Sequence, residues 1–279
     1  MTSVSDLRGK VAVITGGASG IGKGIAQRMV AQGMKVVIAD IEQDSLDKTA
    51  NELSVVGVRT DVRDYASVEA LARSAVKKFG AVHVVCNNAG IGPMGKIADL
   101  TLNDWRWMID VNLWGVIHGV QAFLPILKSN ADGGHIVNTS SMSGLRAVPG
   151  LGAYAVTKFG VLALSETLAQ ELALENSKVG VSVLCPGPVK TQIGRSSRNR
   201  PQELGAGGLA DVNLEDTPNF AGVAIPWVDP LQAGDLVVDA IKRGELYIFT
   251  HPEMVEKVKA RHDGIQQAAA DQVARKRSA

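Results

Sequence analysis

The sequence predicts an α/β fold, a single-domain Rossmann fold with a doubly wound, seven-stranded parallel sheet and helices on both faces. Apolar runs of strand length alternate with longer stretches of helical period along the chain. The runs are almost continuously apolar, which is typical of parallel strands buried on both faces. Because such strands are joined by right-handed crossovers, we expect a doubly wound sheet and one domain over residues 1–279.

The elements follow from these runs in order. The first run, VAVIT (11–15), is β-branched and precedes a helical stretch in which Ile21, Ile25, Met29 and Val30 share one face. Strands are predicted over residues 11–15, 35–40, 56–62, 82–88, 135–140, 179–185 and 245–250. Helices are predicted over residues 21–32, 43–55, 66–79 and 151–174.

Two segments depart from this alternation. Residues 194–217 are polar, rich in Gly and Arg, and lack any period, so they indicate a functional loop or a disordered one. We expect residues 192–228 to form a lid over the substrate. Residues 252–279 are predicted as a C-terminal helical extension with a solvated basic end and with Met254, Val255, Val258 and Ile265 facing inward.

Composition excludes several classes of protein. With 29 Lys and Arg against 28 Asp and Glu, the formal charge of +1 favours neither a nucleic acid nor an anionic membrane as a partner. The 46% hydrophobic content excludes a disordered chain, and two cysteines exclude a disulfide scaffold. The sequence start lacks the apolar core of a signal peptide, and the apolar stretch 108–127 is interrupted by polar residues. We expect a cytoplasmic protein with a small-molecule substrate.

The turn after the first strand carries three glycines. TGGASGIG places Gly16, Gly20 and Gly22 between a strand and a helix. Such glycines allow a tight turn and a close approach of the backbone to a pyrophosphate at the helix N-terminus. The same glycines also occur in ordinary turns, so the strand–turn–helix context is what favours a dinucleotide site.

An acidic residue ends the second strand. Asp40 lies 18 residues after Gly22, where a carboxylate accepts hydrogen bonds from the adenosine ribose and repels a 2′-phosphate. The alternative is a cap for the helix that follows. Because Ala18, Ser19 and Ile41 offer no cation to a phosphate, we expect NAD rather than NADP.

A tyrosine and a lysine lie four residues apart in the helix over 151–174. The spacing places Tyr154 and Lys158 on one helix face. A phenol, with an ordinary pKa near 10, exchanges protons at neutral pH only where a nearby cation favours the phenolate. Ser141 precedes Tyr154 by thirteen residues, at the carboxyl edge of the fifth strand, with Ser140 as the alternative hydroxyl.

Together these motifs resemble the short-chain dehydrogenase/reductase family, and the resemblance covers nearly the whole chain. It rests on TGGASGIG (15–22), Asp61-Val62, NNAG (87–90), Asn112, Ser141, YAVTK (154–158) and PGPVKT (186–191). The spacing of the family selects Ser141 over Ser140.

The resemblance implies a role for each matching residue. Tyr154 would be the general acid/base, Lys158 would lower the tyrosine pKa and hold the nicotinamide ribose, and Ser141 would orient the substrate oxygen. Asn112 would hold a water of a proton relay, although an asparagine inside a helix also serves to satisfy a buried backbone group. The implied cofactor-binding set is Gly16, Ser19, Gly20, Ile21, Gly22, Asp40, Ile41, Asp61, Val62, Asn88, Ala89, Gly90, Tyr154, Lys158, Pro186, Gly187, Val189 and Thr191.

Other reactive residues are interpreted as structural. Cys86 and Cys185 end strands that are not neighbours in the sheet of the family, about 9–10 Å apart and beyond disulfide reach. The five histidines lack metal-ligand spacing, so no metal is predicted. The arginines at 195, 198 and 200 are interpreted as a solvated loop rather than an anion site.

The predicted function is an NAD-dependent oxidoreductase that interconverts a secondary alcohol and a ketone. The alternatives are a 3-oxoacyl-carrier-protein reductase, which usually uses NADPH, and a non-catalytic NAD sensor, which usually lacks the Tyr or the Lys. The expected substrate-lining residues are apolar and indicate an aryl, alicyclic or steroid-like substrate: Met94, Met142, Leu145, Val148, Leu151 and Trp227. The resemblance also implies a homodimer or homotetramer, paired through long helices at about 101–127 and 152–175.

Overall fold

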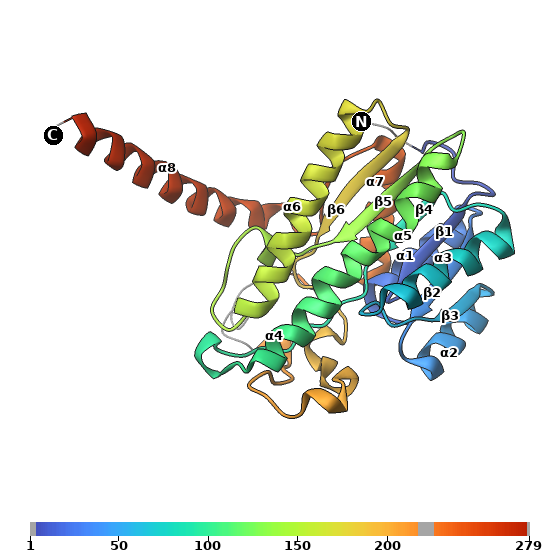
Figure 1. The fold of residues 1–279 in the computed structure, drawn as a ribbon, viewed down its shortest axis with the longest axis horizontal. Helices are drawn as coiled ribbons and strands as arrows, with labels where there is room; N and C mark the ends of the chain where they lie inside the picture. The colour runs from blue at the N-terminus through green and yellow to red at the C-terminus, as the bar shows by residue number, and fades with distance from the viewer. Residues whose placement is uncertain (1–3, 217–225, 278–279) are drawn as a thin grey trace.

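The computed structural model describes residues 4–216 and 226–277 (Figure 1). It contains a seven-stranded parallel sheet in the order β3-β2-β1-β4-β5-β6-β7, which confirms the predicted fold class. The strands are β1 (Val11–Thr15), β2 (Lys35–Asp40), β3 (Val56–Arg59), β4 (Val84–Asn87), β5 (Gly134–Thr139), β6 (Val179–Cys185) and β7 (Tyr247–Phe249). The strand order reverses between β1 and β4, and ligands of open α/β sheets bind at the carboxyl ends of strands at such a point.

Helices cover both faces of the sheet. They are α1 (Gly20–Ala31), α2 (Gln43–Leu53), α3 (Tyr65–Phe79), α4 (Leu102–Ile109), α5 (Gly115–Ser129), α6 (Gly152–Leu174), α7 (Pro230–Arg243) and α8 (Glu256–Arg277). Helices α1, α2 and α7 contribute to one core and α3, α5 and α6 to the other. Along β1, Ala12 and Ile14 belong to the first core, whereas Val11 and Val13 belong to the second. This alternation explains why the strand is apolar at every position.

Several predicted boundaries differ from those in the structure, among them the following three. The third strand ends at Arg59 rather than at residue 62, because the chain turns there toward the N-terminus of α3, which Asp64 caps. The seventh strand is limited to residues 247–249. The expected helix over 101–127 consists of α4, a π-helical turn at residues 110–114, and α5, which continues to Ser129.

Short 3-10 turns, rather than an irregular loop, make up much of the segment that follows β6. They span Ile193–Asn199, Gln202–Leu204 and Leu214–Asp216. The expected lid over 192–228 therefore includes folded turns, while its residues 217–225 lie outside the described part of the chain.

One buried carboxylate attaches this segment to α4. Asp104 is fully buried and accepts hydrogen bonds from the backbone of Thr101 at 2.8 Å and of Gly208 at 2.9 Å, and from Arg200 at 2.7 Å. Burial alone would raise the pKa of Asp104, but these hydrogen bonds outweigh it and hold the pKa at about 2. The Arg200 guanidinium also lies 5.2 Å from the ring centroid of Trp107. The interpretation of Arg200 as solvated is therefore wrong.

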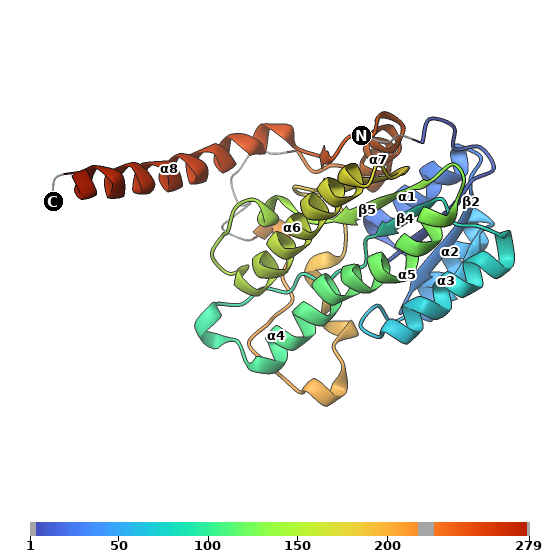
Figure 2. The ribbon, with the colours of Figure 1, turned by 45° about the horizontal axis from the view of Figure 1, so that its top comes forward.

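Helix α8 projects away from the rest of the molecule (Figures 1 and 2). Val258 near its start is buried, whereas Ile265 is 55% exposed. The expectation that Ile265 faces inward is wrong, because the helix has left the body of the protein by that residue. No helix in residues 4–216 or 226–277 is both long enough and apolar enough to cross a membrane.

We predict that Asp104 makes folding stability depend on acid pH. Because its pKa is about 2 in the folded protein and 3.8 ordinarily, its carboxylate stabilises the fold fully above about pH 4. Roughly 2 kcal/mol of the free energy of unfolding is then lost as the pH falls toward 2. Urea unfolding of wild type and of Asp104→Asn at several pH values measures this contribution.

The same experiment has an internal control. Asp104→Asn leaves the Arg200 charge unpaired, which we expect to cost about 3–5 kcal/mol at pH 7, and Asp104→Asn with Arg200→Met should recover part of that loss. A single variant as stable as wild type at pH 7 would contradict this account of the pair.

Candidate active site

A cleft of about 1120 Å³ lies at the carboxyl ends of the strands. Of the predicted cofactor-binding residues, the structure brings the following to its wall: Gly16, Ser19, Gly20, Ile21, Asp40, Ile41, Asp61, Val62, Asn88, Ala89, Gly90, Tyr154, Lys158, Pro186 and Thr191. Gly187 and Val189 line a neighbouring cleft instead. Gly22 lines neither cleft within the described residues, since it packs against the backbone of Gly16.

The glycine-rich turn leaves backbone exposed to the cleft. Gly16 has a φ of +64°, and a Cβ there would lie 2.8 Å from the Cα of Ala89. Asn88 holds the turn in place, since its side chain donates to the carbonyl of Thr15 at 3.0 Å. Ser19 precedes α1 without a side-chain cap, so the amides of the first helical turn remain available to a ligand. Such a helix N-terminus favours an anion.

Asp40 ends β2 and borders the cleft. One carboxylate oxygen accepts the backbone N–H of Ala18 and the other that of Glu42, each at 3.1 Å. Burial raises the pKa of Asp40 despite these hydrogen bonds. The bond to Glu42, the N-cap residue of α2, gives Asp40 a role at the helix start as well as a place in the cleft.

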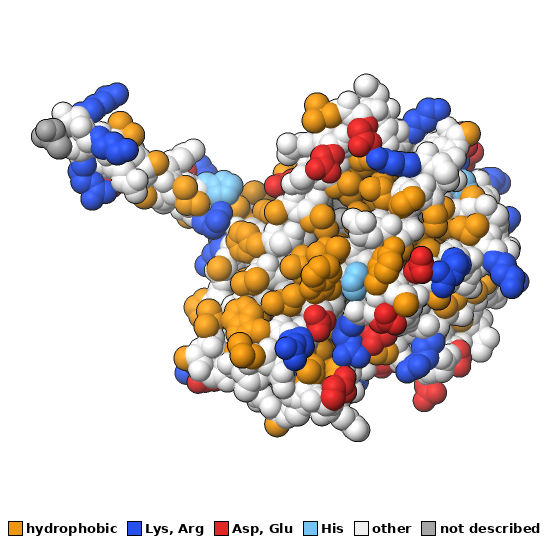
Figure 3. All heavy atoms as spheres, in the orientation of Figure 1, with side chains coloured by type: hydrophobic (Ala, Val, Ile, Leu, Met, Phe, Trp, Pro, Cys, Tyr) orange, Lys and Arg blue, Asp and Glu red, His pale blue; other side chains and the backbone are white. Residues whose placement is uncertain are grey.

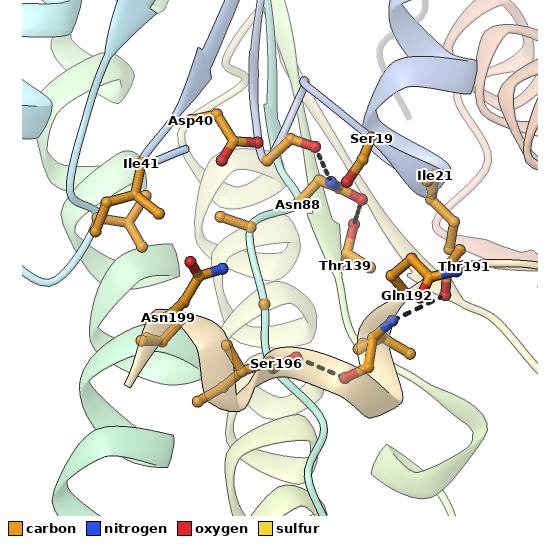
Figure 4. Close-up of a pocket in the computed structure, with 18 of the residues that line it drawn as sticks. Ser19, Ile21, Asp40, Ile41, Asn88, Thr139, Thr191, Gln192, Ser196 and Asn199 are labelled. Carbon is orange, nitrogen blue, oxygen red and sulfur yellow. Dashed lines mark hydrogen bonds between the residues drawn. The ribbon is translucent and has the colours of Figure 1, made fainter. Parts of the chain in front are cut away.

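A turn from the segment after β6 forms the opposite wall. Figure 4 shows Asp40 and Ile41 on one side of the cleft and Ser196 and Asn199 across from them. Arg198 donates to the Glu42 carboxylate at 2.7 Å, and Asn199 donates to the same oxygen at 2.7 Å. Burial raises the pKa of Glu42, but these two partners outweigh it and lower the pKa overall.

Two arginines therefore reach the cleft near Asp40. Arg63 donates from Nε and Nη2 to the carboxylate of Asp61, and Arg198 pairs with Glu42. Among sources of a cation, the sequence analysis considers only positions 18, 19 and 41, and it therefore misses both arginines. Arg198 comes from a segment that is distant in the sequence. The charge of each arginine is compensated by its own carboxylate.

The tyrosine and lysine lie on the same side of α6, as predicted. The Lys158 side chain is buried, and its Nζ donates to the carbonyl of Thr139 at 2.9 Å and lies 5.5 Å from the ring centroid of Tyr154. Ser140 donates to the carbonyl of Lys158 at 2.7 Å, so its hydroxyl is directed to α6. Ser141 instead accepts the backbone N–H of Ser143 at 3.1 Å and lines the second cleft described below together with Tyr154.

Burial shifts the pKa of both residues. It raises the pKa of Tyr154 to about 12, although the hydrogen bond with Ser141 lowers it. It lowers the pKa of Lys158 to about 8. The expected lowering of the Tyr154 pKa by Lys158 is not found in this structure, because desolvation of the phenolate dominates and the Lys158 ammonium is directed to Thr139.

Asn112 lies in the π-helical turn and is fully buried. Its side chain accepts the N–H of Ile91 at 2.8 Å and donates to the carbonyl of Ile91 at 2.9 Å. The side chain thus satisfies a buried backbone segment, the alternative that the sequence left open. It borders neither cleft within the described residues, but it lies beside Gly90, which lines the first.

A second cleft, of about 1080 Å³, adjoins the first. Both are lined by Ile21, Tyr154, Pro186, Thr191 and Ile193, so they meet at the tyrosine. Of the expected substrate-lining residues, Met142, Val148 and Leu151 line the second cleft, as does Ser141.

The other three expected residues do not line it. Met94 pairs with Ala210 by backbone hydrogen bonds, and Leu145 packs against the apolar cluster that includes Met142 and Val258 without lining the cleft in the described structure. Trp227 is half-buried beside the described wall of the second cleft but is not part of it. The residues that sequence reasoning missed include Ile193 and Leu214 from the segment after β6, and Met254 from the tail. The sequence predicts that Met254 faces inward, but no local sequence pattern assigns it to this cleft.

The two cysteines lie on β4 and β6 with β5 between them, as expected. Both are buried free thiols, and burial raises the pKa of each, to about 12 for Cys185. A thiolate is therefore disfavoured at either position.

The chain matches the family model described as short chain dehydrogenase over residues 10–202. A short chain dehydrogenase/reductase from Burkholderia phymatum, solved in complex with NAD, is similar with a TM-score of 0.86 and 36% identity, covering 95% of this chain and 97% of that one. The 3beta-hydroxysteroid dehydrogenase 2 of Eggerthella lenta is 35% identical over 238 residues, 82% of this chain and 90% of its own. The CLA biosynthesis dehydrogenase/reductase of Lactiplantibacillus plantarum is 32% identical over 259 residues, 90% of this chain and 91% of its own.

Proposed function

Because the chain belongs to the short-chain dehydrogenase family of oxidoreductases, we propose that it interconverts a secondary alcohol and a ketone with NAD as cofactor. The observation that carries this proposal is the meeting of two clefts at Tyr154. One cleft has a glycine-rich turn and an acid at the end of β2, and the other is largely apolar. A cofactor and a substrate bound in them would face each other across the phenol.

The residues of the first cleft fit a dinucleotide. The uncapped start of α1 suits a pyrophosphate, and Asp40 retains lone pairs for the hydroxyls of an adenosine ribose. Lys158 and the neighbouring Tyr154 lie where a nicotinamide ribose would be held. When bound, the nicotinamide supplies or accepts the hydride. The NAD complex of the Burkholderia phymatum relative supports the same choice of cofactor.

Tyr154 then handles the proton. With its pKa raised to about 12, the phenol is protonated at neutral pH and is able to donate to a carbonyl oxygen in the direction of reduction. In the direction of oxidation the phenol must act as the phenolate, which the Lys158 ammonium would favour once it turns from the Thr139 carbonyl toward the phenol oxygen. Ser141, which lines the second cleft together with Tyr154, would hold the substrate oxygen at this point.

The second cleft supports a bulky hydrophobic substrate. Its wall includes Met142, Val148, Leu151, Leu214 and Val258. Apolar walls with a few polar groups are typical of sites for such molecules. The name of one relative, a 3beta-hydroxysteroid dehydrogenase, refers to a substrate of this kind.

We also propose that the protein forms a homodimer or homotetramer through α4, α5 and α6. Figure 3 shows hydrophobic side chains gathered over this face of the molecule. Among the exposed residues there, Trp114 is 47% exposed and Val156 is 51% exposed. An apolar face of this kind favours association between copies.

We predict that Tyr154→Phe lowers turnover roughly 100-fold or more, because the phenol alone passes the proton, while the Kd for NAD stays near the wild-type value. Turnover is measured by NADH absorbance over a panel of hydrophobic secondary alcohols, and the Kd by titration. Tyr65→Phe, at a tyrosine that is 41% exposed, is the matched control. Near wild-type turnover in Tyr154→Phe would refute the assignment of the general acid/base.

We predict that the wild-type protein prefers NAD over NADP by a factor on the order of a hundred or more in kcat/KM. Asp40 would lose its hydrogen bonds to the ribose and would repel the 2′-phosphate. Asp40→Ala combined with Ile41→Arg should shift the preference toward NADP. Asp44→Ala, an acid of the same helix start that is not in the described wall of the cleft, is the control. Equal use of both cofactors by the wild type would leave Asp40 with only its role at the helix start.

A further inference from the structure

We propose that the substrate carries a carboxylate, which binds at the outer rim of the second cleft between Arg146 and Lys257. This inference rests on the proposed function and specifies the class of its substrate: an amphipathic hydroxy or keto acid. The hydrophobic part would lie against the apolar wall, with its carbinol or carbonyl carbon at Tyr154.

The charged side chains among the described residues of the second cleft all have one sign. Among the described residues that line it, Arg146 and Lys257 are the charged side chains outside the part shared with the first cleft, and no acid is present. The acids nearest to Lys257 in sequence, Glu253 and Glu256, are exposed and do not border the cleft in the described structure. An apolar cleft with only cations at its rim is complementary to a hydrophobic anion.

These two cations also differ from the other basic residues of the site. The guanidinium groups of Arg63, Arg198 and Arg200 are each paired with a carboxylate. Within residues 4–216 and 226–277, neither the Arg146 nor the Lys257 side chain makes an ion pair within 4.0 Å or a hydrogen bond. Both are exposed, so a pair that either makes with a carboxylate is screened by solvent and modest in energy.

Packing fixes the position of Lys257 relative to the cleft. It lies in the first turn of α8, and the next residue, Val258, is buried in an apolar cluster with Met142. Further along the helix, the Arg261 guanidinium lies 5.1 Å from the ring centroid of Phe159 on α6. The start of α8 is thereby held against the wall of the cleft. The first turn of the projecting helix α8 thus supplies one of the two cations.

Arg146 comes from a different element of the wall. It follows the 3-10 turn Met142–Gly144 that begins at Ser141, and its backbone N–H donates to the carbonyl of Met142 at 3.1 Å. Ser141, the N-cap of this turn, and Arg146, which follows it, thus both line the second cleft. A guanidinium matches the planar shape of a carboxylate, which favours a carboxylate as the anion.

Binding of unreactive probes tests the anchor without any turnover. Decanoate and decanamide have the same chain length and differ in charge, and each is titrated calorimetrically into the protein with and without NAD. We expect decanoate to bind about tenfold more tightly than decanamide at low ionic strength, with the difference shrinking as salt is added. Arg146→Gln with Lys257→Gln should abolish the difference and leave decanamide binding unchanged.

A control variant and a turnover assay complete the test. Lys259→Gln removes a nearby exposed lysine that pairs with Asp263 at 2.7 Å and is not in the described wall, and it should keep the preference for decanoate. In turnover, ricinoleate and lithocholate should exceed their methyl esters in kcat/KM by about tenfold in wild type and not in the double variant.

The outcomes separate this inference from the proposed function. Equal binding of decanoate and decanamide by the wild type, or an unchanged preference in the double variant, would overturn the carboxylate anchor. Efficient oxidation of the methyl esters together with that result would leave the proposed function intact. A preference for decanoate with no oxidation of any alcohol in the panel would instead support the anchor and refute the proposed function.

Discussion

Two hydrogen bonds between the end of β5 and one residue of α6 set the geometry on which the rest of the site depends. The Nζ of Lys158 donates to the carbonyl of Thr139, and the hydroxyl of Ser140 donates to the carbonyl of Lys158. Both bonds are buried, so breaking either would leave a polar group without water. Tyr154 lies one helical turn before Lys158, and Ser141 directly follows Ser140. The two bonds therefore bring Tyr154 and Ser141 to the wall of the same cleft.

The segment after β6 contributes to the walls of both clefts. It is held to α4 by the pair between Arg200 and Asp104, and to the start of α2 by the pair between Arg198 and Glu42. Ile193, in the same segment, lines both clefts. A movement of this segment would therefore open the wall near Asp40 and the apolar wall near Tyr154 together.

The fold and most of the first cleft could be predicted from the sequence because local patterns encode them. Doubly buried strands and a glycine-rich turn are recognisable from short stretches of sequence. The sequence also marks the ends of α7, with Pro230 at its start and Gly244 at its end, although this helix is not among those predicted. The pairs of Arg198 and Arg200 could not be predicted, since their partners are 156 and 96 residues away in the chain. The same holds for Met254 and Lys257, which reach the second cleft only through tertiary packing of α8.

The central claim is that a hydride and a proton are exchanged at one point, where the two clefts meet at Tyr154. The most direct measurement is the transfer of isotope from NADH carrying deuterium at both C4 positions of the nicotinamide to a bulky hydrophobic ketone, with the product alcohol analysed by mass spectrometry and NMR. The account predicts deuterium on the carbinol carbon of a single alcohol enantiomer. It also predicts that the rate of this transfer falls in Tyr154→Phe. Binding of NADH with no deuterium transferred to any ketone of a broad panel would contradict it.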